Sequence, residues 1–404
     1  MTKAVLAVVT FLLVCSLPAM VVLAGPHGDA SPVEIQQATS SSAVAEDHHE
    51  GTTSRLELSG ATVSEYSTVG PDFGGAFAAE DAAMRDEATV AAVSNELRHG
   101  TDEERRETLE EAVERAADRA EALEEREMAL IESYRNDELT DREFVRALAQ
   151  LNRDSASLAA TFDEYEAMAE EVSGYSVDPP TDLLDAFRGP VTTMFVDQIR
   201  AAGTDRQVAL VTAAEGGAVV STIDGTSYLR EAIRFDNRDR SASPTLDSYS
   251  AAEEAVDERY PWIIGLGPGE FRDNILRNQA ADLYQYEAMH PQGDLLAYWD
   301  IGTGNLFREI QVLSISQLPT TTVEETWEED ALELTIEETP HDGPMEINVT
   351  DTETGDPVDA EISIDDVTLG TTGDDGTLWV LPPPGSYELT ATADDATVTA
   401  TVGD

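Results

Sequence analysis

The chain has 404 residues, and its 81 Asp and Glu against 24 Lys and Arg give a formal net charge of -57 at pH 7. This charge disfavours nucleic acid as a partner, because affinity for a phosphate backbone depends on Lys and Arg. A hydrophobic fraction of 41% argues against wholesale disorder, since it provides enough apolar surface to offset the conformational entropy lost on folding.

The first 24 residues have the pattern of an export signal. A run of 21 mostly apolar residues follows Lys3 and ends in small residues at Ala24. We therefore predict a signal peptide over 1–24 and an extracellular or cell-surface location. A run of this length is also long enough to span a bilayer, so an uncleaved anchor is the alternative, and a membrane is a partner only in that case.

Cleavage after Ala24 would remove Lys3 and Cys15, the only lysine and the only cysteine of the chain. A chain without amine and thiol side chains has no phosphate-binding or Schiff-base lysine, no thiolate nucleophile, and no cysteine ligand for zinc or an iron–sulfur cluster. We expect no cofactor, no catalytic residue and no metal-binding residue. The acidic coat predicts adaptation to molar salt, where the Debye length is about 3 Å, and it resembles the proteins of halophilic archaea.

Residues 25–54 have few large apolar side chains and no periodicity, which predicts a flexible spacer. A short strand is expected over 55–66, and then a helix over 77–100 that ends at Gly100. Together with the long helices that follow, these elements make up a helical region over 55–175.

Two long helices come next, and a capping box starts each of them. Thr101 with Glu104 starts the first helix, and Thr140 with Glu143 starts the second. Apolar or small residues recur in steps of three and four, with one break at Glu127. They are Leu109, Val113, Ala116, Ala120, Leu123, Leu130 and Tyr134, and then Phe144, Leu148, Leu151, Ser155, Leu158, Phe162, Tyr165, Ala169 and Val172. This spacing predicts an antiparallel coiled-coil hairpin roughly 50 Å long, which acts either as a rigid arm for a partner or as a packing element.

After Pro180 the long helical pattern gives way to short strand-like runs, which predicts a middle α+β domain over 190–318. The expected helices and strands are 191–202, 206–213, 217–224, 227–237, 249–265 and three strands within 281–315, with turns at 291–294 and 302–305. The stretch AAEEAVDERYP, followed by YQYEAM and DLLAYWDIGTGNLFRE, resembles the PepSY-type domain. That resemblance implies an association with peptidase inhibition.

Residues 319–330 are acidic and rich in Thr, and we predict a linker there. From 331 to 404, apolar and polar residues alternate in short runs separated by Gly, Pro and Asp, which predicts a β-sandwich. The stretches TGDPVDAEISIDD and TTGDDGTLWVLPPPGSYELTATA resemble the carboxypeptidase regulatory-like, transthyretin-type sandwich, a non-catalytic accessory in that family. The order of segments resembles a group of uncharacterised secreted proteins of halophilic archaea. The predicted fold class is α+β multidomain, with a coiled-coil hairpin, a PepSY-like α+β domain and a β-sandwich.

Acidic residues are too frequent here for a pair of carboxylates to identify a catalytic site. Two Asp-rich turns, 351–357 and 372–377, offer oxygen ligands that suit calcium, but they lack the spacing of a calcium loop, so exposed turns are the simpler interpretation. Residues 48–50, His-His-Glu, have the side chains of a metal site but lie in the spacer, where nothing fixes their geometry.

His290 lies beside Asp294 and, in the sequence, near Asp300. No Gly-x-Ser-x-Gly motif and no suitably spaced serine accompany it, so a histidine in a hairpin loop is a simpler interpretation than a hydrolase site. Asn348 begins the sequon Asn-Val-Thr on an expected strand and is a candidate for glycosylation.

The sequence therefore favours a non-enzymatic secreted or cell-surface protein of a halophile, which acts as a structural or protein-binding module for an unknown protein partner at the cell envelope. The alternative is a regulator or inhibitor of an extracellular peptidase that works through the PepSY-like domain. A hydrolase that uses His290 and nearby carboxylates is the third hypothesis.

Overall fold

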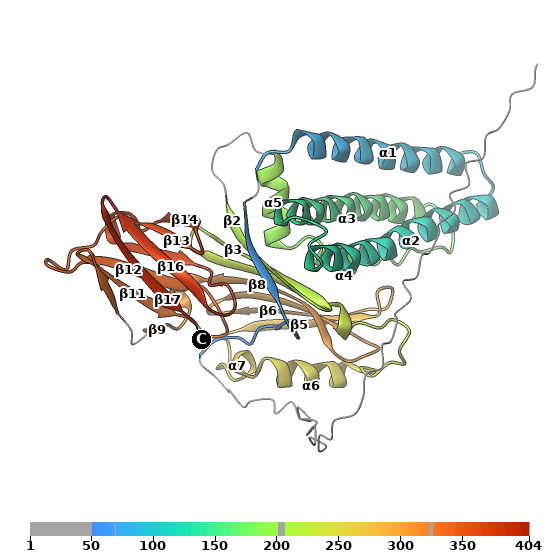
Figure 1. Ribbon diagram of the computed structural model, residues 1–404. Coiled ribbons are helices and arrows are strands. Elements are labelled where there is room, and N and C mark those ends of the chain that lie inside the picture. The colour runs from blue at the N-terminus through green and yellow to red at the C-terminus, as the bar shows by residue number, and fades with distance from the viewer. Residues whose placement is uncertain (1–50, 69, 201–206, 323–325, 404) are drawn as a thin grey trace, which may run out of the picture. The chain divides into compact units, whose positions relative to one another are not determined.

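The computed structural model describes residues 51–68, 70–200, 207–322 and 326–403, all within one compact unit, Asp47–Asp404. This unit contains an eight-stranded antiparallel sheet, a layer of helices and a C-terminal pair of smaller sheets (Figure 1). Among these residues, no helix is both long and apolar enough to cross a membrane. The predicted signal peptide lies outside the described residues.

The helical layer begins with α1 (Phe73–Leu97), α2 (Asp102–Arg135) and α3 (Asp141–Ala169). Both predicted capping boxes are present. The backbone N–H of Thr101 donates to the Glu104 carboxylate at 2.8 Å, and the equivalent bond from Thr140 to Glu143 is 3.0 Å long. The two long helices and the turn between them are therefore where the sequence places them.

The hairpin of α2 and α3 is part of a larger packed layer. α3 buries residues on more than one face and packs against α1, α4 (Thr181–Ala186) and α5 (Pro190–Arg200) as well as α2. These contacts favour the interpretation of the α2–α3 hairpin as a packing element over its interpretation as a rigid arm for a partner. Glu127, the one break in the predicted apolar stripe, is itself buried in α2.

The eight strands follow the order β1-β2-β3-β4-β8-β7-β6-β5, and all neighbours are antiparallel. In chain order they are β1 (Val63–Thr68), β2 (Val208–Ala214), β3 (Gly217–Asp224), β4 (Ser227–Arg234), β5 (Arg272–Asn278), β6 (Leu283–His290), β7 (Gly293–Asp300) and β8 (Leu306–Ser314). The meander of β2 to β4 and the three strands β6 to β8 confirm the prediction. The sequence analysis missed β5, because its residues are mostly exposed and polar and do not alternate.

Different elements cover the two faces of this sheet. On one face, β2, β3 and β4 share a core with the layer of α1 to α5. On the other face, α6 (Tyr249–Arg259) and α7 (Pro261–Ile264) share a core with β6 and β7 that is rich in Tyr and Trp (Figure 1). Alternate residues of each strand serve opposite faces, so both sides of the sheet are buried.

An extended segment, 51–58, crosses the α6 face without joining the sheet ladder; we call it the strap. Its carbonyl groups accept hydrogen bonds from side chains of the sheet and of α6, for example from Gln292 at Gly51 and from Gln311 at Ser54. The strand expected over 55–66 therefore begins late, at Val63, because the backbone of the strap is occupied by these side chains.

The C-terminal sandwich has two antiparallel sheets, in the orders β10-β11-β12-β15 and β14-β13-β16-β17. Its strands are β9 (Thr321–Thr322), β10 (Trp327–Glu329), β11 (Leu332–Glu338), β12 (Met345–Asp351), β13 (Glu361–Ile364), β14 (Val367–Thr371), β15 (Thr377–Val380), β16 (Tyr387–Ala393) and β17 (Ala396–Val402). The predicted sandwich is confirmed. The linker predicted over 319–330 is wrong where it is described, because β9 and β10 both pair with β11 and Trp327 packs on the sandwich core.

Candidate functional site

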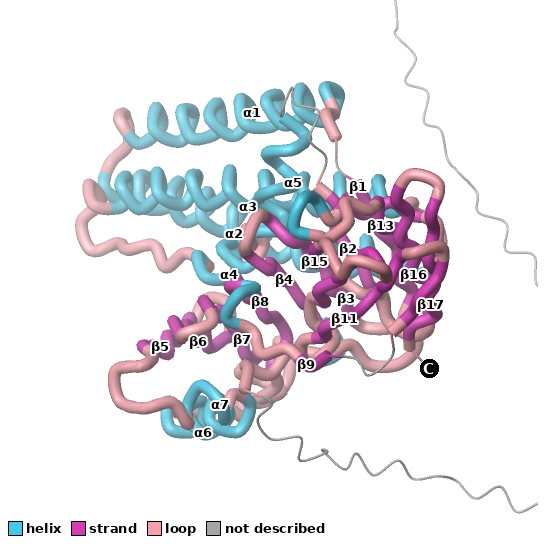
Figure 2. The backbone as a smooth tube through the Cα atoms, turned by 90° about the vertical axis from the view of Figure 1, so that its left-hand side faces the viewer, coloured by secondary structure: helices cyan, strands magenta, loops and turns pink. Residues whose placement is uncertain are grey.

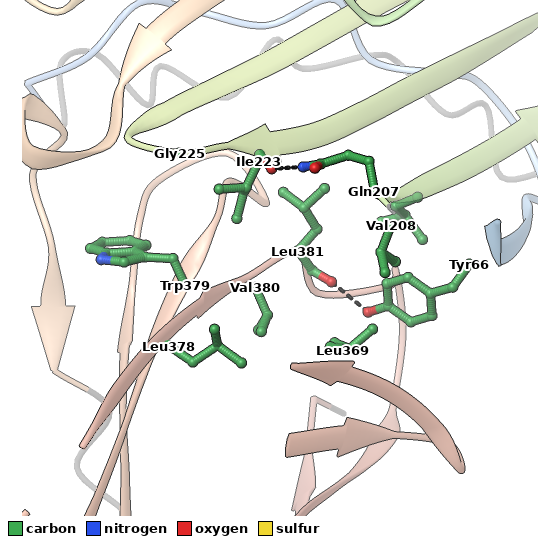
Figure 3. Close-up of a pocket in the computed structure, with 11 residues that line it drawn as sticks. Tyr66, Gln207, Val208, Ile223, Gly225, Leu369, Leu378, Trp379, Val380 and Leu381 are labelled. Carbon is green, nitrogen blue, oxygen red and sulfur yellow. Dashed lines mark hydrogen bonds between the residues drawn. The ribbon is translucent and has the colours of Figure 1, made fainter. Parts of the chain in front are cut away.

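A cavity of about 300 Å³ opens at the seam between the eight-stranded sheet and the sandwich, and we call it the seam pocket. It is lined by Tyr66, Gln207, Val208, Leu210, Ile223, Gly225, Leu369, Leu378, Trp379, Val380 and Leu381. Figure 3 shows the side chains of Ile223 and Leu381 on one wall and those of Leu378 and Leu369 on the other.

Local strand geometry positions these side chains. β15 ends at Val380, and the chain leaves the sandwich there, which brings Trp379 and Leu381 toward β2 and β3. Tyr66, near the end of β1, donates its hydroxyl hydrogen to the Leu381 carbonyl oxygen at 2.5 Å (Figure 3). Burial, together with nearby acidic groups, raises the pKa of Tyr66, so the phenol stays neutral and acts as a donor.

None of the eleven lining residues is charged, in a chain where 26% of residues are Asp, Glu, Lys or Arg. Tyr66 and Gln207 are the lining residues whose side chains carry hydrogen-bonding groups beyond the indole of Trp379. A concave surface of this kind suits an uncharged group.

Two Arg-Glu dipeptides lie in the centre of the sheet, one in β4 and one in β8. They are Arg230-Glu231 and Arg308-Glu309, and all four side chains are buried. The antiparallel register places Ala232 opposite Glu309 and Ile233 opposite Arg308. Because side chains alternate along each strand, each face of the sheet receives one Arg and one Glu.

On the helical face, Glu231 lies at the start of α5. Its carboxylate accepts the backbone N–H groups of Val191 at 2.6 Å and Thr192 at 3.0 Å. Burial raises the pKa of Glu231 to about 7, although these two donors and Arg308 oppose the shift. Gly189 gives the carboxylate room, since a Cβ at that position would lie 2.2 Å from the Glu231 carboxyl carbon.

Arg308, on the same face, joins two helices to the sheet. It pairs with Glu127 of α2 and donates to the carbonyl oxygen of Ala186, at the end of α4, at 3.1 Å. Burial also raises the pKa of Glu127, against the attraction of Arg308. The cavity beside these groups has a volume of about 20 Å³, which has room for one water molecule and for no ligand.

On the α6 face, Glu309 and Arg230 hold the strap. Glu309 pairs with Arg230 at 3.0 Å and accepts the hydroxyl hydrogen of Tyr260 at 2.7 Å. The two charged groups then bind the backbone of one residue: Leu56 donates its N–H to Glu309 at 2.8 Å and accepts from Arg230 at 2.5 Å. These contacts give both buried charges hydrogen-bond partners.

The structure separates His290 from Asp300, one of the two carboxylates that lie near it in the sequence. His290 pairs with Gly293 at one end of the β6–β7 hairpin, whereas Asp300 pairs with Leu283 at the other end, roughly 24 Å along the strand. Asp294 is exposed, whereas His290 is buried. Burial lowers the pKa of His290 to about 4, and its Nδ1 accepts the backbone N–H of Gln292 at 3.3 Å. The geometry is that of a buried neutral histidine in a hairpin.

The remaining candidates lie apart from the seam pocket. Asn348 is half-buried on β12, on the face opposite the core residues Ile347 and Val349, and glycosylation there stays a prediction. In the 351–357 turn, Asp351 accepts the backbone N–H groups of the turn itself, as in an ordinary Asx turn. Among the described residues no group of His, Cys, Asp and Glu has the arrangement of a metal site, and residues 48–50 lie outside them.

Comparison with known protein families divides the chain into three parts. The first 206 residues match the model of a domain of unknown function (DUF7096), which is just over half of the chain. The chain belongs to this family. Residues 209–319 match a family of unknown function (DUF7094), and residues 323–400 match an archaeal fibronectin-III type-like domain. No curated protein and no solved structure matches the chain.

The fold does not follow the boundary between DUF7096 and DUF7094. The DUF7096 region contributes β1 and the strap to a sheet whose other strands come from the DUF7094 region. All four residues of the two Arg-Glu dipeptides, which lie in the DUF7094 region, contact DUF7096 residues. The two regions are therefore one folding unit rather than the separate helical and α+β domains that the sequence predicts.

The sequence analysis missed this polar centre, although two signals pointed to it. Glu127 interrupts an apolar stripe, and Arg-Glu occurs twice inside runs that are otherwise typical of buried strands, YLREAI and LFREIQ. Charged residues at such positions are rarely buried without partners. The seam pocket had no comparable signal, because its residues come from segments that are far apart in the sequence.

Proposed function

We propose that this protein is a non-enzymatic binding module, secreted or held at the cell surface of a salt-adapted archaeon, and that a protein partner inserts an apolar side chain into the seam pocket. The uncharged lining of that pocket carries the proposal. At molar salt, hydrophobic contacts are strengthened while exposed charges are screened, so such a pocket is the part of an acidic surface best suited to recognition.

A matched pair of variants tests the binding proposal. Trp379→Asp places a charge in the pocket, whereas Thr401→Asp places the same charge on an exposed position of β17. Each variant and the unmodified chain would be used to capture proteins from the envelope of the producing organism at molar salt. We expect the wild type and Thr401→Asp to retain the same protein and Trp379→Asp to lose it. Equal retention by all three, or turnover of any substrate by the purified chain, would refute the proposal.

Export rests on the apolar N-terminal segment. If 1–24 is a cleaved signal, the mature protein begins at Gly25 and is found outside the cell. N-terminal sequencing of the protein from the medium and the envelope would identify the cleavage point, and recovery from the cytoplasm alone would refute export.

A second candidate function is regulation of an extracellular peptidase by the middle region. The order of α6 followed by the antiparallel strands β6 to β8 supports the PepSY resemblance, and so does the turn in which Asp300 accepts the backbone N–H of Thr303 at 2.7 Å. The intervening strand β5 departs from the quoted pattern. Inhibition of a co-purifying peptidase by the purified chain would support this function, and the absence of any effect on that peptidase would remove it.

The sandwich fits either function as a non-catalytic accessory, which is what the carboxypeptidase regulatory-like resemblance implies. Its buried side chains are apolar apart from Thr339 and Thr372 among the described residues, and Asp351 and Asp375 accept backbone N–H groups of their own turns.

A further inference from the structure

β5 forms one outer edge of the eight-stranded sheet, and no strand among the described residues pairs with its free side. It pairs only with β6, through seven consecutive residue pairs without a bulge, at the edge of the sheet in Figure 2. Folded proteins usually block such edges with proline, bulges or a covering element, because the free backbone groups attract another strand. β5 has the sequence RDNILRN, which contains no proline, and five of its seven residues are exposed.

Exposed large apolar side chains occur on both faces of the sheet near this edge, Leu276 and Met289 on the face opposite α6 and Tyr249 on the α6 face. Of the six that are exposed among the described residues, three lie here: Leu276 of β5 at 41% exposure, Met289 of β6 at 61%, and Tyr249 of α6 at 54%. Tyr249 packs edge-on against Tyr284, which is paired with Arg277. A partner strand beside β5 would therefore meet exposed apolar side chains on each face of the sheet.

We propose that β5 pairs with β5 of a second copy of this chain, antiparallel and about a two-fold axis that passes through Ile275. This register pairs all seven residues of the strand. Asp273 of each copy faces Arg277 of the other, Arg272 faces Asn278, and Asn274 faces Leu276. The pairing is self-complementary in charge, and it contains no pair of like charges.

The neighbouring symmetric registers lack this complementarity. An axis through Asn274 places Asp273 opposite Ile275, and an axis through Leu276 places Arg277 opposite Ile275. A charged group then faces an apolar one, and fewer residues pair. The charge pattern therefore selects the Ile275 register.

The charged residues of β5 are available for this role. None of Arg272, Asp273 and Arg277 makes an ion pair within the described residues. The guanidinium of Arg277 lies over the ring of Tyr284, 5.6 Å from its centroid, and Asp273 is close enough to raise the pKa of Tyr286. Both side chains thus lie on the α6 face, where a partner strand would bring them together.

Salt controls the equilibrium, because each copy carries a formal charge of -57. Two such chains repel each other over the roughly 10 Å Debye length of 0.1 M salt, whereas at 1 M salt that length is about 3 Å. We expect the dimer at molar salt and monomers at 0.1 M.

Charge reversal provides the test, with the oligomeric state of the full chain measured by sedimentation at molar sodium chloride. Asp273→Arg and Arg277→Asp each place like charges opposite one another, so each should raise the dissociation constant of the homodimer at least ten-fold. Mixing the two variants restores opposite charges in every pair, so a heterodimer should form with near wild-type affinity. The double variant Asp273→Arg/Arg277→Asp should form homodimers again. The matched control, Asp224→Arg at the exposed end of β3, should leave the dimer unchanged.

Recovery on mixing separates loss of the interface from loss of the fold, because an unfolded variant would not form the heterodimer. Hydrogen exchange gives a second readout, in which the amides of β5 become protected as the dimer forms. A wild-type chain that stays monomeric at molar salt and 100 μM would overturn the proposal. So would a dimer that Asp273→Arg leaves intact. Protection in the monomer of the β5 amides that point away from β6 would also overturn it, because it would assign this edge to another occupant.

Discussion

The C-terminal sandwich and the eight-stranded sheet bury different kinds of side chain. Among the described residues of the sandwich, Thr339 and Thr372 are the only buried polar side chains. The sheet buries two arginines and two glutamates at its centre and holds distant segments with them. The sandwich is thus stabilised by alternation within short neighbouring strands, and the sheet by polar contacts between segments that are up to 257 residues apart.

This contrast shows what buried charge contributes to the sheet. Apolar packing alone would seat the helices and the strap on the sheet in several similar positions, because dispersion and hydrophobic contacts have little direction. Hydrogen bonds from Glu231 to α5, and from Glu309 and Arg230 to the strap, have direction and fix one arrangement. Desolvation of these buried charges lowers the stability of the sheet. The sandwich does not bear this cost, because no charged side chain is buried among its described residues.

The largest expected effect comes from removing the shared cation on the helical face. Arg308→Met would leave Glu127 and Glu231 buried without their positive partner, so we expect a loss of about 3 to 5 kcal/mol in the free energy of unfolding. Urea unfolding at molar salt would measure it. Adding Glu127→Gln and Glu231→Gln should recover most of the loss. The exposed control Arg85→Met should cost less than about 0.5 kcal/mol, and a similar loss in both would show that the buried pair has no special role.

The second effect is a dependence on pH. The pKa of Glu231 is about 7 in the folded chain, above its ordinary value, so the folded state binds this proton more tightly than the unfolded state does. The contribution of Glu231 protonation to the free energy of unfolding is therefore fully present below about pH 4.5 and is lost as the pH rises through 7. Glu231→Gln keeps the acceptor for Val191 and removes the titration, so the variant should gain up to about 3 kcal/mol over the wild type between pH 5 and pH 8.

The contribution of His290 to the pH dependence of stability has the opposite sign to that of Glu231, so the two should be measured separately. The folded pKa of His290, about 4, lies below the ordinary value, so stability falls as the pH drops from about 6.5 to 4. Unfolding curves for Glu231→Gln and His290→Phe, taken as differences from the wild type at each pH, would resolve the two slopes. A difference for Glu231→Gln that does not change with pH would contradict the assignment.

A smaller effect is expected in the sandwich, and it should not depend on pH. Ile347→Val removes one methyl group from a fully buried position of β12, which should cost about 1 kcal/mol. The same loss at pH 5 and pH 8, measured by thermal unfolding, would sharpen the contrast with the sheet. A loss that varies with pH would mean that the sandwich core is coupled to a titrating group.

The smallest effect concerns the seam. Tyr66→Phe removes the hydrogen bond to Leu381 that joins β1 to the end of β15, and we expect a cost of about 0.5 to 1 kcal/mol. Calorimetry should show the transitions of the sheet and the sandwich moving apart in this variant. Unchanged coincidence of the two transitions would show that other contacts at the seam couple them.

Local patterns in the sequence predict much of this protein. Thr-x-x-Glu motifs predict where α2 and α3 begin, and alternation predicts most strands of the three sheets but not β5, β9, β10 and β14. These features depend on neighbouring residues, because capping and the inside–outside alternation of a strand are decided within a few positions. The composition excludes chemistry that needs lysine or cysteine beyond residue 24 in the same direct way.

Only the tertiary structure decides which distant residues meet. It brings Glu127 to Arg308, ties Leu56 to Glu309, moves Asp300 away from His290, and forms the seam pocket from β1, β2, β3 and β15. Such contacts depend on strand order and on the packing of whole elements, which no short stretch of sequence encodes. The energies that create them are sums over many weak contacts across the fold, whereas caps and turns arise from a few strong local ones.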